Sequence, residues 1–314
     1  MKKVLFATTA LVASAGIAAA EVNLSGSAEM GVVGGSAQET QFHTDIDVTF
    51  KMEGTTDNGL TFGASIDLDE SDGSGSCTLP GGILANGAVA CSVSGASPAF
   101  AEKSAGGETI FISGDFGTIT MGDTDSGFDA VLDEIHSLGG AGSIDGAHEA
   151  NTSDGDGVGQ PDSQTLSYKN TFNGLEFVVS INLDDAAGSN DHHYSIGVGY
   201  TFDLASGSVD LGLGYSDAGA ADAFGFSAVV KLDNGFAFGG RYEDASGASN
   251  EAWGVGVGYK TGAYGFNAQY SEKGGVDGWG VAAQYDLGGA KLQAGYGDVS
   301  GGASTWSLGV AMKF

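Results

Sequence analysis

Carboxylates are the side chains in this sequence with the type and spacing to do chemistry, and they gather in one segment. Residues 122–163 form the longest irregular stretch that follows an identifiable strand pattern, and loops of this length are usually functional or disordered. The acids in its first half are Asp123, Asp125, Asp129, Asp133 and Glu134. Their expected chemistry is electrostatic, because acids that line a passage attract cations and repel anions.

The same segment has helical spacing over residues 126–140. Ser126, followed three positions later by Asp129, is typical of a helix start, and Gly139 is typical of a helix end. The apolar residues that fall on one stripe are Phe128, Val131, Leu132, Ile135 and Leu138.

On the other side of this predicted helix lie Asp129, Asp133 and His136. If strands elsewhere in the chain enclose a channel, we expect the apolar stripe to dock on its inner wall near Val178 and Val229, which leaves Asp129 and Asp133 pointing into the lumen. The alternative is a solvated surface helix whose charges have no particular role.

A second set of charged residues belongs to the predicted strands that would form that wall. In residues 41–53, the face opposite the apolar side chains carries His43, Asp45, Asp47, Thr49 and Lys51. The same alternation turns three basic residues inward: Lys231, Lys260 and Arg241, the only arginine of the chain. So few basic residues among many acids predict cation selectivity, stronger at low salt, where charges are less screened.

The motifs of enzymes are missing. The sequence has no G-x-S-x-G, H-E-x-x-H or C-x-x-C, and the glycine-rich run 254–259 is a strand alternation rather than a phosphate-binding turn. His192 and His193 are adjacent on a predicted strand, so they face opposite sides and cannot bind one metal together. We expect no enzymatic activity and no required cofactor.

Two further groups of residues could form bonds. Cys77 and Cys91 lie in a Gly- and Ser-rich stretch, where a disulfide is expected in an exported chain; the alternative is two unpaired thiols. Asp154, Asp156 and Asp162 loosely resemble a calcium loop, although the spacing and final Glu of an EF-hand are missing. The alternative there is a solvated acidic turn.

Residues 1–20 have the features of a signal peptide, which leaves residues 21–314 as the mature domain. Lys2 and Lys3 precede an apolar core that ends in Ala18, Ala19 and Ala20. Cleavage after Ala20 would remove two of the 11 basic residues and leave 9 against 40 acids, a net charge of −31.

Composition narrows the fold class. A net charge of −29 excludes nucleic-acid binding, and 56 glycines with 10% aromatic residues and no collagen period make a helical bundle improbable. After the N-terminus no apolar run reaches the roughly 18–20 residues that a membrane helix needs.

Period-two alternation instead predicts about sixteen strands, the first near 22–34 and the last near 304–314. Their length, their apolar faces and their alternating short and long connections predict an all-β, antiparallel, transmembrane β-barrel. With about sixteen strands its lumen would hold water.

The last strand gives a specific signal. Residues 305–314 place apolar side chains on one face and end on Phe314. A terminal phenylalanine with this alternation resembles the assembly signal of Gram-negative outer-membrane proteins.

Together, EVNLSGSAEMGV (21–32), FKMEGTTDNGLTFGASI (50–66), FISGDFGTITMGD (111–123) and the last strand resemble the general porins of the Rhodobacter and related alphaproteobacterial type. The resemblance implies a sixteen-stranded barrel in the outer membrane of a Gram-negative bacterium, a homotrimer, short periplasmic turns and long outer loops. It also implies that the third long loop folds into the lumen, so we call residues 122–163 the constriction loop.

The sequence departs from this family at the narrowing. There the family sets loop acids against a cluster of Arg and Lys on the opposite wall, whereas Asp45 and Asp47 stand here where relatives carry arginines. A strong transverse field is therefore doubtful, and an acidic pore is expected instead.

The aromatic residues suggest which surface meets other subunits. Residues 21–100 hold four aromatics, and residues 164–314 hold 22. Lipid-facing strands favour Tyr and Trp near the interfaces, while small residues permit close protein contact. We expect the trimer contact near the first strand and lipid along the aromatic arc; the alternative is simple drift in composition.

The function expected from these features is passive diffusion of cations and small hydrophilic solutes through an outer-membrane channel. The alternatives are a plugged outer-membrane barrel that acts as an adhesin or structural protein, and a soluble, acidic, secreted all-β protein.

Overall fold

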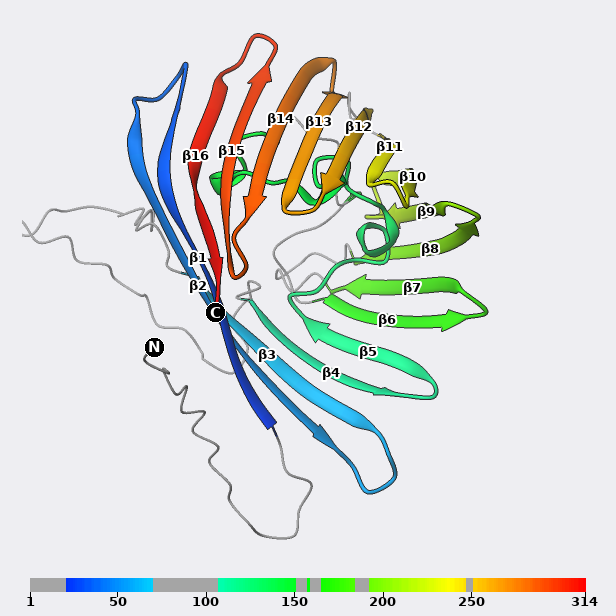
Figure 1. The fold of residues 1–314 in the computed structure, drawn as a ribbon. Helices are drawn as coiled ribbons and strands as arrows, with labels where there is room; N and C mark the ends of the chain where they lie inside the picture. Colours follow the sequence, from blue (N-terminus) through cyan, green and yellow to red (C-terminus); the bar gives the residue numbers. More distant parts are fainter. Residues whose placement is uncertain (1–20, 70–106, 151–156, 159–164, 184–191, 247–250) are drawn as a thin grey trace, which may run out of the picture.

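The computed structural model describes residues 21–69, 107–150, 157–158, 165–183, 192–246 and 251–314 (Figure 1). These residues form strands β1 (Glu21–Gly35), β2 (Gln41–Thr55), β3 (Thr61–Asp69), β4 (Glu108–Gly114), β5 (Gly117–Gly122), β6 (Thr165–Phe172), β7 (Leu175–Asn182), β8 (His193–Leu204), β9 (Gly207–Asp217), β10 (Asp222–Leu232), β11 (Phe236–Ala245), β12 (Ala252–Thr261), β13 (Tyr264–Lys273), β14 (Val276–Asp286), β15 (Ala290–Val299) and β16 (Ser304–Lys313). Three short 3₁₀ helices are η1 (Asp129–Val131), η2 (Leu138–Gly140) and η3 (Ile144–Gly146). Among the described residues, none of the helices has the length and apolar character to cross a membrane.

The strands form one closed antiparallel barrel in which each strand pairs with its sequence neighbours and β16 returns to β1. At one end the connections are short, such as 173–174 and 205–206, and at the other end they include 70–107 and 123–164. The predicted sixteen-stranded all-β barrel is therefore confirmed. Closure gives every strand two partners, which removes the unpaired edges of an open sheet.

The two faces of the wall differ as the alternation predicts. Outward side chains are apolar and exposed, with Leu24 at 65%, Met30 at 54% and Leu308 at 60%. Inward positions include buried hydroxyls, such as Ser180 and Ser227. A wall of this kind is suited to a lipid surround and a polar interior.

Aromatic contacts on the wall are confined to one arc. Neighbouring rings pair at centroid distances of 4.4 to 5.6 Å on strands β8 to β15: Tyr200–Phe202, Phe236–Tyr259, Tyr264–Tyr285, Trp253–Tyr270 and Trp279–Tyr296. The arc around β1 to β3 contributes none of the described ring pairs outside the loop.

The constriction loop lies inside the barrel (Figure 1), and the hydrophobic core is formed between this loop and the wall. Phe128 and Leu132 pack with Ala223, and Leu138 packs with Val229 and Ala237. The predicted docking of the apolar stripe is confirmed, including burial of Val178 and Val229. The loop thus folds inward, as the resemblance implied.

The predicted helix over 126–140 is wrong, because the loop forms separate 3₁₀ turns rather than one helix. Leu132 has an extended backbone (φ −94°, ψ 120°), and Gly139 has a positive φ of 74°. The capping contact expected at the start of that helix is nevertheless present, since the Asp129 N–H donates to Ser126 Oγ at 3.2 Å.

Wall side chains explain why the helix does not form. The N–H groups of Gly127, Phe128 and Asp133 donate to serine hydroxyls of β7, β8 and β10 at 2.9 to 3.2 Å. On β13, Asn267 Nδ2 donates to the carbonyls of Ile135 and Leu138, both at 3.1 Å. The wall therefore satisfies backbone groups that a helix would otherwise pair internally.

Inward glycines let the loop lie directly on the wall. A Cβ at Gly197 would overlap the Gly127 carbonyl oxygen, and one at Gly212 would overlap that of Val131. At Gly199, two positions along β8 from Gly197, a Cβ would meet Val131 at an ordinary 3.6 Å. Only some wall glycines are therefore required by close approach.

The loop also reaches the place where the barrel closes. The Phe314 N–H donates to the Gly26 carbonyl at 2.9 Å, which ties the last residue to β1. Above this seam, the Asp145 N–H donates to Glu29 Oε2 at 3.0 Å. The Ile144 side chain fills the space beside Gly31 and Gly309. The third 3₁₀ turn thus covers the junction of β1 and β16.

Gly197→Ala is expected to destabilise the barrel by about 1–3 kcal/mol, because the new methyl group must displace the loop backbone. Gly199→Ala is the matched control on the same strand, with the same change in strand propensity and room for the methyl group. Urea unfolding in detergent micelles measures both, and equal stabilities of the two variants would contradict close docking of the loop at Gly197.

Candidate functional site

The constriction loop and the wall beside it enclose a charged cavity of about 600 Å³. Among the residues predicted from sequence, those that line it are Asp125, Asp129, Asp133, Glu134, Lys231 and Lys260. The structure therefore brings four of the five predicted loop acids together with two of the three inward basic residues. The fifth acid, Asp123, accepts the Gly107 N–H at 3.2 Å.

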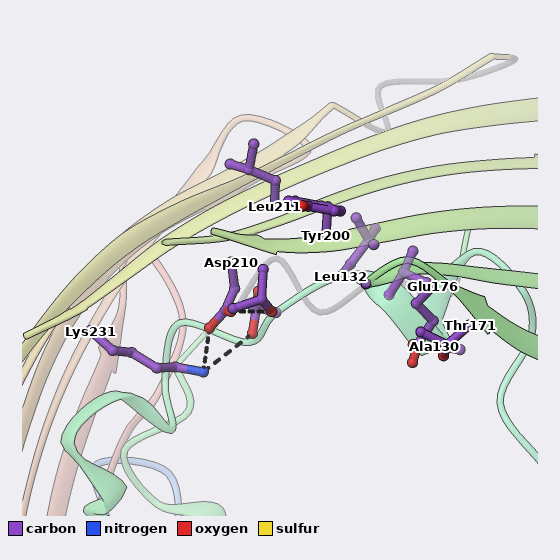
Figure 2. Close-up of a pocket in the computed structure, with 13 residues that line it drawn as sticks. Ala130, Leu132, Thr171, Glu176, Tyr200, Asp210, Leu211 and Lys231 are labelled. Carbon is purple, nitrogen blue, oxygen red and sulfur yellow. Dashed lines mark hydrogen bonds and ion pairs between the residues drawn. The ribbon is translucent and has the colours of Figure 1, made fainter. Parts of the chain in front are cut away.

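Lys231 links the loop to the wall. Its Nζ lies 2.7 Å from Asp210 Oδ2 on β9 and 4.0 Å from Asp133 Oδ1 on the loop (Figure 2). Burial raises the pKa of the Asp133 carboxyl above its ordinary value, and the charge of Asp210 adds to this effect, while Lys231 opposes it. As the pH falls, the Asp133 carboxyl therefore takes up a proton earlier than an ordinary aspartate does.

Arg241 occupies a different environment. Its side chain is fully buried, with Nη2 3.4 Å from Asp129 Oδ1 and 4.0 Å from Glu243 Oε2. A buried guanidinium between two carboxylates fastens the loop to β11 instead of presenting charge to the open lumen. The inward direction predicted for Arg241 is confirmed, but the side chain lies beneath the loop.

Asp129 and Asp133 are each 29% exposed in their side chains, so both retain access to the lumen while pairing with wall cations. His136 lies beside Glu134 and Glu149, at 3.2 and 3.8 Å. The basic side chains of β10 and β11 thus lie on the same side of the lumen as the loop acids that they contact.

The wall formed by β1 and β2 is acidic. His43 Nε2 lies 3.6 Å from Glu29, and Lys51 Nζ lies 3.6 Å from Glu53. Asp47 accepts a hydrogen bond from Ser27 Oγ at 2.9 Å. Asp45 and Asp47 line a second cavity, described below, so the predicted wall residues divide between two places.

Several charged residues of this site were missed from the sequence. Glu29 and Asp210 lie on inward faces that the alternation of β1 and β9 would have identified. The Asp210–Lys231 pair joins neighbouring strands β9 and β10. What the alternation could not show is the hydrogen bond from the Asp145 N–H to Glu29, because that bond depends on where the loop lies.

Other predicted residues lie outside the described part of the chain: Cys77, Cys91, Asp154, Asp156, Asp162 and the signal peptide 1–20. The disulfide and the calcium loop stay predictions. Within the described ranges, no group of three or more His, Cys, Asp or Glu residues is arranged to hold a metal ion.

Known proteins resemble this chain in sequence and in fold. A family model described as Gram-negative porin matches residues 7–278. A porin of Rhodobacter capsulatus is 29% identical over 209 residues, which are 64% of this chain and 58% of that protein, so the match spans little more than half of the relative.

Solved structures agree on the fold. A triple mutant of Rhodopseudomonas blastica porin superposes with a TM-score of 0.70 at 16% identity, over 94% of this chain and 100% of the other. A porin refined at 1.8 Å resolution gives a TM-score of 0.69 at 22% identity over the same shares.

Arg241→Met is expected to lower the free energy of unfolding by about 3–5 kcal/mol, because it removes the buried cation between Asp129 and Glu243. Lys231→Met is the control, since its side chain is 53% exposed and exposed ion pairs contribute about 0–1 kcal/mol. Urea unfolding in micelles compares them. A loss at Arg241 no greater than that at Lys231 would show that the buried pair does not fasten the loop.

Proposed function

The chain belongs to the Gram-negative porin family, and we propose that it forms a water-filled, cation-selective channel through which ions and small hydrophilic solutes diffuse passively. Family membership places the barrel in the outer membrane of a Gram-negative bacterium, and it places the chain among porins rather than enzymes. It also removes the soluble secreted protein from the alternatives, in agreement with the exposed apolar outer face.

The observation that carries the proposed selectivity is the sign of the charges on both sides of the lumen. Loop acids Asp125, Asp129, Asp133 and Glu134 line one cavity, while Asp45 and Asp47 line another against β1 and β2. On the loop side, Arg241 and Lys231 are engaged in ion pairs with carboxylates. Four acids stand with two lysines in each of the two cavities, and this excess of acids enriches cations.

Two further copies of this chain and the surrounding lipids are the proposed partners. Val22, Leu24 and Met30 on β1 are exposed by 54 to 65%, and Phe42 on β2 by 91%. The aromatic pairs lie away from this arc, on β8 to β15. An apolar surface without aromatic pairs supports protein contact there, while the aromatic arc suits the lipid interface.

Replacing lumen acids is expected to lower the cation preference. A unit charge 4 Å away acts on an ion with about 1 kcal/mol in bulk water, so Asp129→Asn/Asp133→Asn and Asp45→Asn/Asp47→Asn should each reduce the cation-to-anion permeability ratio severalfold. Reversal potentials across planar bilayers in a KCl gradient measure this. The effect should be greater at low salt.

Asp57→Asn/Asp233→Asn is the matched control, because it removes two acids from the short turns and leaves the charged cavities intact. An unchanged ratio in both lumen variants would contradict the proposed selectivity. Stepwise ohmic conductance supports an open channel, whereas inserted barrels without conductance would favour the plugged alternative.

A photo-reactive cross-linker at Met30 is expected to join subunits, while the same group at outward-facing Val281 on β14 should not. Denaturing gels of the protein cross-linked in outer-membrane vesicles separate monomers from linked subunits. Cross-links formed from Val281 but not from Met30 would contradict the proposed subunit contact at β1 and would place it near β14 instead.

A further inference from the structure

A second cavity of about 440 Å³ lies in the lumen over β1, β2, β15 and β16. Its charged lining residues are Glu29, Asp45, Asp47, Asp286, Lys291 and Lys313. Ser143 of the constriction loop also contacts it, so the loop bounds one side of the cavity. The four strands are neighbours in the barrel, with β1 and β16 at the closing seam (Figure 1).

Strand register sets the charges of this cavity in two rows. Along one row, Asp286 of β14 is followed by Lys291 of β15 and Ala311 of β16, then by Glu29 of β1 and Asp45 of β2. Strands lie about 4.8 Å apart, so Lys291 and Glu29 are separated by one strand that contributes only a small side chain.

The second row repeats this order. Lys313 of β16 is followed by Ser27 of β1 and then Asp47 of β2. Lysine and carboxylate again stand about 10 Å apart at their backbones, with a small residue between them. Lys291 and Lys313 therefore face the carboxylates of β1 and β2 across a gap that the protein leaves unfilled, with Asp286 on the far side of Lys291.

Neither lysine of the cavity forms an ion pair with a described carboxylate. In the part of the chain that the structure describes, the lysines within 4.0 Å of a carboxylate are Lys51, Lys169 and Lys231, so neither Lys291 nor Lys313 is among them. Gln293, which lines the same cavity, is 8% exposed, and its Oε1 lacks a hydrogen-bond partner there. A buried amide without a full set of partners is ready to receive a donor from a ligand.

We propose that this cavity is a lumen subsite for amino acids and short peptides, which rests on the proposed channel function. A carboxylate of the solute would bind Lys291 and Lys313, and its ammonium group would bind Glu29, Asp45 and Asp47. Four carboxylates against two lysines leave the cavity net negative, so a solute with an ammonium group is admitted and a purely anionic one is repelled. Diffusion of zwitterions past this wall is slowed by transient binding.

Three matched probes test the charge requirement on the unmodified protein: glycylglycine, glycylglycinamide, which lacks the carboxylate, and N-acetylglycylglycine, which lacks the ammonium group. Single-channel recordings in KCl measure the excess current noise that each adds. Glycylglycine should produce noise at about tenfold lower concentration than either relative. Equal effects of glycylglycine and glycylglycinamide would overturn the proposal.

Lys291→Met/Lys313→Met should raise the required glycylglycine concentration about tenfold and leave an open channel in KCl. Lys273→Met, at the far end of β13, is the control and should behave as the unmodified protein does. If glycylglycine adds the same current noise in the double variant as in the unmodified protein, the proposed subsite is also refuted. A protein that conducts no KCl at all would instead refute the channel, so the two failures are distinguishable.

Discussion

The structure depends on one constraint, which is that a loop inside a barrel must satisfy its backbone hydrogen bonds without a regular element of its own. Serines of β7, β8 and β10 receive the loop N–H groups, and Asn267 and Gln269 of β13 donate to loop carbonyls. Buried backbone groups left without partners cost about as much as lost hydrogen bonds. The hydroxyls and amides of the wall are therefore what hold the loop in its extended path.

Electrostatics follows from that path. Because the loop is pinned along β7 to β13, its aspartates come within reach of Lys231 and Arg241 on the same wall. The basic side chains of β10 and β11 are thereby paired with loop acids, whereas the carboxylates of β1 and β2 face Lys291 and Lys313 across an unfilled cavity. The charge pattern of the pore is in this sense a result of how the loop is held.

The fold was largely predictable, whereas the site was predictable only in part. Alternation in segments such as 192–202 marks the faces of single strands, and it correctly turned Asp47, Lys231 and Arg241 inward. Helical spacing over 126–140 was misleading. An extended chain whose backbone polar groups bind the wall buries the same apolar side chains as a helix would. Local periodicity reports which residues are buried, but it does not report which partner takes each backbone N–H.

Pairing across the site was beyond sequence reasoning for a related reason. Arg241 and Asp129 are 112 positions apart in the chain, and nothing local to either residue indicates the other. Register could in principle have been inferred from the turns, and with it the rows that join Lys291 to Glu29. The position of the loop over those rows could not.

The placement of η3 over the seam has a consequence for how the molecule is assembled. The surface on which Ile144 and Asp145 rest is built from both β1 and β16, the first and last strands, so it exists only after the two ends of the chain have met. The η3 turn can therefore take its final position only after β1 and β16 have paired, whereas the seat of residues 127–138 on β7 to β13 does not require that closure. In a barrel that is still open between β1 and β16, η3 could contact only one of the two strands on which it rests.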